Sequence, residues 1–274
     1  MIIHSDPIVC KDKLEKDLLE IYDQFFERMN IDEKTGLIKD LINEKKDWID
    51  PKTKKQKRFS AYAYIGSKYG QKTKILFVGL DIGSDELSEE GREGTYLDFK
   101  KRREQVEEHE LKNAHMLGTC ICSIYFLKSE PELNKSDWET HPDKTYKETI
   151  KELKLLLNTE NPLSYVALTN FHKFVTVGRG MQGKGEMMGS KDRHFINNNG
   201  TKTREIEEGV LVNEINTLKP KIIIFQSADF KKNTRLISKI KDILRDTKIY
   251  AGYHPSYRNL KRNSRKLITS LKEQ

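Results

Sequence analysis

Residues 74–80 read KILFVGL, a short apolar run between two polar stretches. A run of this length and composition is typical of a strand with both faces buried, as in a parallel sheet. Similar runs recur at 164–170 (SYVALTN), 221–227 (KIIIFQS) and 248–253 (KIYAGY), and ICSIYFL at 121–127 is a fifth, weaker candidate. The repetition predicts a sheet of four or five strands.

Helical patterns separate these strands. The segments 144–157 (KTYKETIKELKLLL), 204–218 (REIEEGVLVNEINTL) and 230–245 place apolar residues three and four positions apart. Strands that alternate with helices are typical of βαβ units, which build parallel sheets. The predicted fold class is α/β, with a three-layer α/β/α arrangement around a central, mostly parallel sheet of four or five strands.

The first 60 residues precede this pattern. Residues 11–29 are predicted to form an amphipathic helix, and a short helix is expected at 37–41. The apolar face of the first helix consists of Leu14, Leu18, Leu19, Tyr22, Phe25 and Phe26. The polar stretch KKDWIDPKTKKQKRF (45–59) is expected to be an exposed loop. We therefore expect an N-terminal helical addition at 1–60 and an α/β domain at 61–274.

The composition indicates the class of partner. Fifty Lys and Arg against 42 Asp and Glu give a net charge of +8, which favours an acidic partner such as nucleic acid or anionic lipid. A lysine-rich composition is also a habit of some AT-rich genomes. Three cysteines make neither a disulfide framework nor a four-thiolate cluster. With no secretion signal and no run of about 18 apolar residues, we expect a cytoplasmic protein without a membrane partner.

Polar residues follow three of the predicted strands. GLDIGSDE comes after the first, TNFHKF after the strand at 164–170, and GYHPSYRN after the last. Ligands of open parallel sheets bind beyond the carboxyl ends of the strands. Asp81, Asn170 and His254 are therefore expected at one edge of the sheet.

The order of these motifs resembles the uracil-DNA glycosylase superfamily. The resemblance extends over roughly residues 74–260 and rests on GLDIG (79–83), LTN (168–170), PKIII (220–224) and HPS (254–256), of which HPS after a strand is the most specific. It implies a DNA glycosylase that binds DNA, flips a base out of the stack and hydrolyses its bond to the sugar. The iron-sulfur branches of the superfamily need four cysteines and this chain has three, so we expect no metal and no cofactor. The domain at 61–274 would be the catalytic one.

The resemblance assigns a role to each of the three polar residues. Asp81 would orient the attacking water and stabilise the positive charge on the sugar. Asn170 would hydrogen-bond the edge of the flipped base, and His254 would donate a hydrogen bond to the carbonyl oxygen of the leaving base. Each residue also has a plain alternative, because Asp caps helices, Asn closes turns and a loop histidine is often only structural.

Two further segments fit the family pattern. Tyr96, in Gly94-Thr95-Tyr96, would stack on the flipped base, or it is an ordinary core tyrosine. Leu260 would enter the duplex and fill the vacated space, or it begins the core face of a C-terminal helix. The residues around it that would contact DNA are Ser256, Arg258, Lys261 and Arg262.

Departures from the family pattern suggest the substrate. Ile82 replaces the common proline, and Gly83 stands where uracil-specific members keep a tyrosine that blocks substituents at carbon 5. The pocket is thus expected to admit a base bulky at carbon 5, as in superfamily members that defend bacteria by excising glucosylated hydroxymethylcytosine from phage DNA. The glycine-rich segment 178–200 would form part of the sugar-accommodating rim, or a surface insertion.

The predicted function is that of a monofunctional glycosylase in anti-phage defence, which acts on DNA, double-stranded in the simplest case, and leaves an abasic site. One alternative is a repair glycosylase for uracil or hypoxanthine, and another is a catalytically silent DNA-binding member. No G-x-G-x-x-G or G-x-x-x-x-G-K-[ST] motif is present, so no nucleotide cofactor is expected. His109, His115, Cys120 and Cys122 do not have a zinc spacing, and the oligomeric state stays open.

Overall fold

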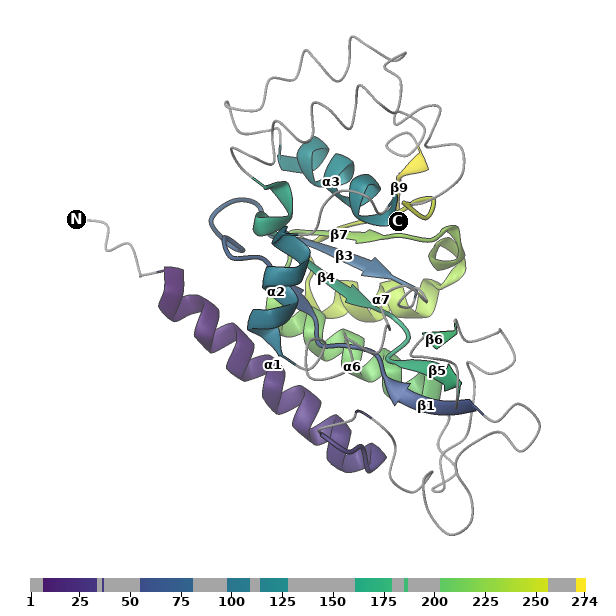
Figure 1. The fold of residues 1–274 in the computed structure, drawn as a ribbon. Coiled ribbons are helices and arrows are strands. Elements are labelled where there is room, and N and C mark those ends of the chain that lie inside the picture. The colour runs from purple at the N-terminus through teal and green to yellow at the C-terminus, as the bar shows by residue number, and fades with distance from the viewer. Residues whose placement is uncertain are drawn as a thin grey trace. The chain divides into compact units, whose positions relative to one another are not determined.

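The computed structural model describes residues 7–33, 36, 55–80, 98–108, 114–127, 161–178, 185–186, 203–255 and 270–274 (Figure 1). Its helices are α1 (Pro7–Met29), α2 (Phe99–Glu108), α3 (Ala114–Leu127), α6 (Thr203–Leu218) and α7 (Thr234–Ile243), with 3₁₀ turns η4 (Pro162–Tyr165) and η5 (Ala228–Lys232). Its strands are β1 (Lys55–Phe59), β2 (Tyr64–Ile65), β3 (Ile75–Gly79), β4 (Val166–Asn170), β5 (Phe174–Gly178), β6 (Gly185–Glu186), β7 (Ile222–Phe225), β8 (Lys248–Ala251) and β9 (Lys272–Glu273).

The chain divides into two compact units, each made of three stretches. Unit 1 consists of Met1–Tyr64, Leu80–Arg102 and Thr169–Leu218. Unit 2 consists of Ile65–Gly79, Arg103–Leu168 and Lys219–Gln274. The expected boundary after residue 60 stays a prediction.

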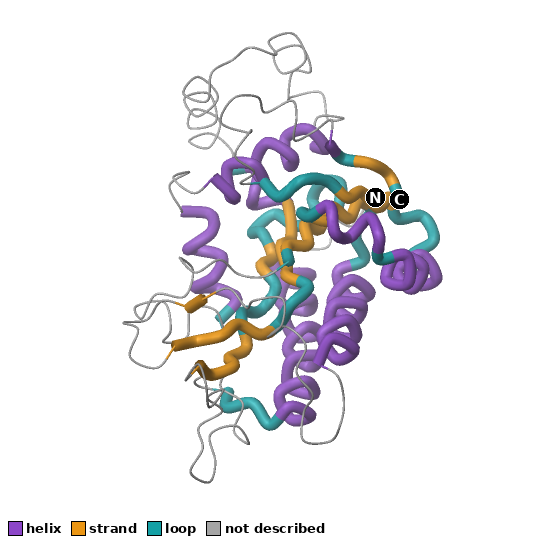
Figure 2. Tube along the Cα trace, turned by 90° about the vertical axis from the view of Figure 1, so that its right-hand side faces the viewer, coloured by secondary structure: helices purple, strands orange, loops and turns teal. Residues whose placement is uncertain are grey.

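A six-stranded sheet has the order β2-β4-β3-β7-β8-β9. β3 pairs with β7 and β7 with β8, both in parallel, whereas β9 is antiparallel to β8. These strands are visible from the side in Figure 2. The sheet confirms the α/β class with mostly parallel strands, and it contains strands at the predicted positions 74–80, 164–170, 221–227 and 248–253. It has six strands instead of four or five because two-residue strands, β2 and β9, extend its edges.

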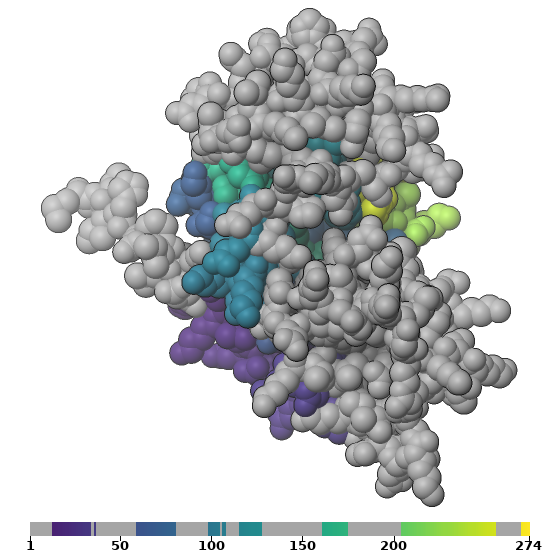
Figure 3. All heavy atoms as spheres, in the orientation of Figure 1, coloured from purple at the N-terminus to yellow at the C-terminus, as the bar shows by residue number. Residues whose placement is uncertain are grey.

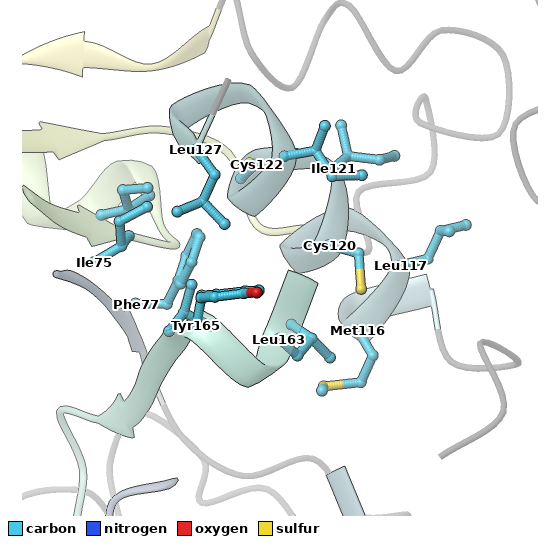
Figure 4. Packing of buried hydrophobic residues seen from close by; sticks show 13 residues of the cluster. Ile75, Phe77, Met116, Leu117, Cys120, Ile121, Cys122, Leu127, Leu163 and Tyr165 are labelled. Atoms are coloured by element: carbon cyan, nitrogen blue, oxygen red, sulfur yellow. The ribbon is translucent and has the colours of Figure 1, made fainter. Parts of the chain in front are cut away.

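The prediction of a strand at 121–127 is wrong, since these residues form the second half of α3. Leu117, Cys120, Ile121 and Ile124 recur at helical spacing and pack in one cluster with residues of β3, η4, β4 and β7. The side chains of α3 fill the space above Phe77 in Figure 4. The seven-residue window contained only one half of a 14-residue helix that is apolar on most sides, and such a fragment has no helical signature of its own.

The helices at 11–29 and 204–218 are confirmed by α1 and α6, and the segment 230–245 contains the end of η5 and all of α7. The expected helices at 37–41 and 144–157 lie outside the described residues.

The expectation that 45–59 is a loop is wrong for its last five residues. β1 pairs antiparallel with β5, which pairs antiparallel with β6, in a separate three-stranded sheet. The backbone hydrogen bonds of an antiparallel pair do not depend on side-chain polarity, so a sequence as polar as KQKRF can form a strand. Of the segment 178–200, only Gly178 and β6 are described.

The core of unit 1 forms where α1 packs against α6. α1 buries Leu18, Tyr22, Phe25, Phe26 and Met29, which confirms most of the predicted face. Leu19 is 36% exposed, on the outer side of a helix whose surface is visible in Figure 3.

A buried ion pair lies in this core. The ammonium of Lys173 donates to both carboxylate oxygens of Glu214, each at 2.7 Å, and to Thr169 Oγ1 at 2.9 Å. The Tyr22 hydroxyl donates to Glu214 Oε1 at 2.6 Å and accepts from the backbone N–H of Ala63 at 2.7 Å. Both charged side chains are almost fully buried, at 1% and 0% exposure. The pair therefore connects α1, the end of β4 and α6 without contact with water.

Burial and charge act against each other in this group. Burial lowers the pKa of Lys173, and the neighbouring Glu214 carboxylate partly offsets that effect. Burial and the same carboxylate raise the pKa of Tyr22 well above its usual value, so the tyrosine stays a neutral donor.

Lys173→Met is expected to destabilise the protein by about 3–5 kcal/mol, because it leaves the Glu214 charge buried without a partner. Lys16→Met, at an exposed position of α1, is the matched control and should change the free energy of unfolding little. Denaturant unfolding measures both. The double variant Lys173→Met Glu214→Leu should recover part of the loss, and a double variant no more stable than Lys173→Met would contradict the ion-pair explanation.

Candidate functional site

Asn170 is the last residue of β4 and is half-buried in unit 1. Within the described part of the chain, its side chain makes no hydrogen bond. The residue before it, Thr169, is fixed by a hydrogen bond from its hydroxyl to Glu214 Oε2 at 2.8 Å, besides the one it accepts from Lys173. The amide of Asn170 thus stands at the end of a strand that buried polar groups hold firmly.

The segment that leads to Asp81 lies close to the same strand end. The backbone N–H of His172 donates to the carbonyl oxygen of Leu80 at 2.8 Å. His172 is buried, and its Nδ1 lies 3.3 Å from a carboxylate oxygen of Glu207. The other oxygen of Glu207 accepts the N–H groups of Lys173 and Phe174 at 2.7 and 3.3 Å. Leu80, the neighbour of Asp81, is therefore tied to the turn that follows Asn170.

In unit 2, His254 lies three residues after β8, and its imidazole contacts helix α3. His254 Nε2 lies 3.3 Å from Nδ1 of His115, in the first turn of α3, and the ring centroids are 4.9 Å apart. The backbone before His254 is held on both sides, since Gly252 N–H donates to Phe225 O at 3.1 Å and Tyr253 N–H to Ser270 Oγ at 3.0 Å. The site histidine thus has a fixed backbone and an imidazole partner.

Hydrogen bonds fix the first half of α3 against the carboxyl end of the neighbouring strands. Thr119 Oγ1 donates to the His115 carbonyl at 3.0 Å and accepts from the Gln226 side-chain amide at 2.9 Å. Gln226 comes directly after β7, and its backbone N–H donates to Val78 O of β3 at 2.9 Å. His115 is therefore placed by a chain of contacts that begins in the sheet.

A glycine allows the loop of His254 to approach α3. A Cβ at Gly118 would lie 2.6 Å from the carbonyl oxygen and 2.7 Å from the Cβ of Pro255. Any larger residue at this position must push the helix and the loop apart. The contact of Gly118 with Pro255 brings the residue next to His254 against the helix that carries His115.

His115 is a neutral imidazole at ordinary pH. Burial, and to a smaller degree the neighbouring His254, lower the pKa of His115 from 6.5 to about 3. It therefore carries a single N–H, on one of its two ring nitrogens.

The thiols of α3 have no sign of reactivity. Cys120 and Cys122 are buried and unpaired with each other, burial raises the pKa of Cys122 to about 12, and the pKa of Cys120 is raised as well. Within the residues that the structure describes, no three His, Cys, Asp or Glu side chains are grouped so as to hold a metal ion. No helix of that part is both long and apolar enough to cross a bilayer.

The other eight predicted site residues lie outside the described residues: Asp81, Gly83, Tyr96, Ser256, Arg258, Leu260, Lys261 and Arg262. Their roles stay predictions.

The sequence does not identify His115 as the partner of His254. Nor does it identify Thr119 and Gln226, whose hydrogen bonds hold the helical turn that begins at His115. The spacing of His115 and Thr119, one helical turn apart, would have been informative only once 121–127 was recognised as helical.

Gly118→Ala is expected to destabilise the protein, because the added methyl overlaps Pro255. In Gly209→Ala the added Cβ meets nothing within 4 Å, and the change should stabilise α6 by about 0.5–1 kcal/mol. Thermal unfolding of the two variants compares the same substitution in a closed and an open environment. A gain in stability for both would show that α3 and Pro255 are not in close contact.

The depressed pKa of His115 predicts a pH dependence of stability. The unfolded chain protonates this residue below about pH 6.5, whereas the folded protein resists protonation until about pH 3. Stability is thus fully present above pH 6.5 and falls as the pH drops toward 3, with a contribution from His115 of at most about 1.4 kcal/mol per pH unit. Denaturant unfolding of wild type and His115→Asn across this range should show wild type losing stability relative to the variant as the pH falls below 6.5, and a stability difference that is constant with pH would contradict the assignment.

Comparison with models of known protein families gives no match for this chain, and comparison with curated proteins gives none either. What the chain does must therefore follow from its own residues and their surroundings.

Proposed function

We propose that this protein is a monofunctional DNA glycosylase of the uracil-DNA glycosylase type. It hydrolyses the bond between deoxyribose and a base that is bulky at carbon 5, and it leaves an abasic site. The observation that carries the proposal is the fixed position of His254, three residues after the end of β8, with its ring against His115. A three-layer α/β/α architecture is part of the proposal.

The hydrogen bond between His172 N–H and Leu80 O supports the assignment of Asp81 and Asn170. Asp81 is the residue after Leu80, and Asn170 lies two residues before His172. This bond brings the backbones of the two motif segments together, as a shared role toward one nucleotide requires. Either motif alone, without the other beside it, would be weaker support for this assignment.

The chemistry needs one group on each side of the glycosidic bond. The oxygen of a water molecule bonds to C1′ while the C1′–N bond breaks, and the bonding electron pair leaves with the base. The carboxylate of Asp81 orients the water, accepts its proton and stabilises the positive charge on the sugar. An imidazole N–H of His254 donates to the carbonyl oxygen of the base, where negative charge collects.

The substrate class that we propose is based on the glycine in the first motif. Gly83 offers no side chain to exclude a substituent at carbon 5, so the base we propose is glucosylated hydroxymethylcytosine in phage DNA. Asn170 would hydrogen-bond its edge, and Tyr96 would stack on it. The net charge of +8 suits a DNA partner, with the basic residues after His254 at the phosphates and Leu260 in the vacated space.

The test is release of free base from DNA that contains glucosylated hydroxymethylcytosine, hydroxymethylcytosine, uracil, hypoxanthine or a thymine mismatch. Wild type should release only the glucosylated base, and Asp81→Ala should lower the rate by about a hundredfold or more. Asp242→Ala, at an exposed position of α7, is the matched control and should match wild type.

Other outcomes distinguish the alternatives. Release of uracil or hypoxanthine would make the protein a repair glycosylase. DNA binding without release of any base would make it a silent member of the fold, and equal activity of Asp81→Ala and wild type would remove Asp81 from the mechanism.

A further inference from the structure

The contact between His115 and His254 can form with either ring as the hydrogen-bond donor, and the two cases differ in chemistry. The two nitrogens that face each other at 3.3 Å can share only one proton in a hydrogen bond, and either ring can be its donor. The choice decides which nitrogen of His254 carries the remaining proton.

We propose that His115 is a positioning residue that sets the tautomer of His254: its Nδ1–H donates to His254 Nε2, so that the His254 proton is held on Nδ1. The direction of this hydrogen bond rests on the proposed function, in which His254 donates to the leaving base, whereas the contact between the two rings does not. The pairing itself is a property of the free protein.

The direction of the hydrogen bond follows from what each arrangement leaves available. If His254 donates through Nε2, its neutral ring has no proton on Nδ1 and cannot donate from that nitrogen to the oxygen of a leaving base. If His115 donates, His254 Nδ1 keeps its hydrogen and can stabilise the negative charge on that oxygen. Only the second arrangement allows a neutral His254 to act as a donor.

The surroundings of His115 suit this role. Its carbonyl accepts a hydrogen bond from the Thr119 hydroxyl, which accepts one from the side-chain amide of Gln226, directly after β7. These hydrogen bonds hold the start of α3 against the sheet. The close approach of Gly118 to Pro255 sets the position of the residue next to His254. The low pKa of His115 keeps it a neutral partner that does not place a second positive charge beside His254. A side chain held in this way acts as a fixed donor.

Substitutions at His115 separate its donor group from its volume. His115→Asn presents an amide nitrogen at the place of Nδ1 and can donate to His254, whereas His115→Phe keeps a ring of similar size and cannot donate. A loss caused by packing alone affects the donor-bearing Asn variant at least as much as Phe. Rescue by Asn therefore distinguishes hydrogen bonding from a structural role.

The test is two-bond ¹H–¹⁵N NMR of the histidine rings near neutral pH, which reports the tautomer of each imidazole. The His254 signals are those that His254→Gln removes. Wild type and His115→Asn should show a single His254 tautomer with the proton on Nδ1, and His115→Phe should lose it. A proton on Nε2 in wild type, or the same pattern in His115→Phe, would overturn the proposal, as would a change of the signals on addition of a chelator, because the pair would then hold a metal ion.

Activity provides the second readout. On the substrate that wild type processes, His115→Phe should lower kcat by about tenfold or more with little change in KM, and His115→Asn should restore most of it. Equal kcat in the two variants would overturn the positioning role. If wild type releases no base, the proposed function fails, while the NMR result still decides the tautomer of His254.

Discussion

The register of the parallel strands β3, β7 and β8 is the constraint on which the candidate site depends. Val78, Phe225 and Ala251 lie level across the three strands. All three are fully buried, so their backbone polar groups must find partners within the sheet. The ladder continues one residue beyond this level, with Gln226 N–H on Val78 O and Gly252 N–H on Phe225 O. The residues that follow therefore leave the sheet from fixed positions.

Polar side chains close to the candidate residues are held by hydrogen bonds to buried groups. Asn170 follows Thr169, whose hydroxyl is bonded to the buried pair of Lys173 and Glu214. His115, beside His254, begins the same helical turn as Thr119 and receives its hydroxyl hydrogen bond. In both units, a polar side chain near a residue that contacts the ligand in the proposed function makes its hydrogen bonds inside the protein. Such support is what gives a binding or catalytic side chain a single geometry.

The sequence predicted the elements whose pattern is local. β3, β7 and β8 are short apolar runs between breakers, and α1 and α6 are long enough for the helical period to be visible. It failed at 121–127, where a helix that is apolar on most sides resembles a buried strand, and at β1, whose polar residues are held by pairing with β5.

The candidate site was predictable in part for the same reason. His254 and Asn170 could be singled out because His254 directly follows a predicted strand and Asn170 is the last residue of another. The pairing of His254 with His115 joins residues that lie far apart in the chain, and it depends on the close contact of Gly118 with Pro255, which has no signature in either segment.

The interleaving of the two units has a consequence for how the protein is made. Because the chain passes from one unit to the other five times, neither unit is a continuous piece that a ribosome could release for folding by itself. Unit 1 is complete at Leu218, but the parallel partner of β3 is β7, which begins only at Ile222. During synthesis β3, which is apolar on both faces, therefore lacks its partner β7 until most of the chain has left the ribosome. The nascent chain should therefore depend on chaperones that cover hydrophobic segments, and slow translation before residue 222 should lower the yield of native protein.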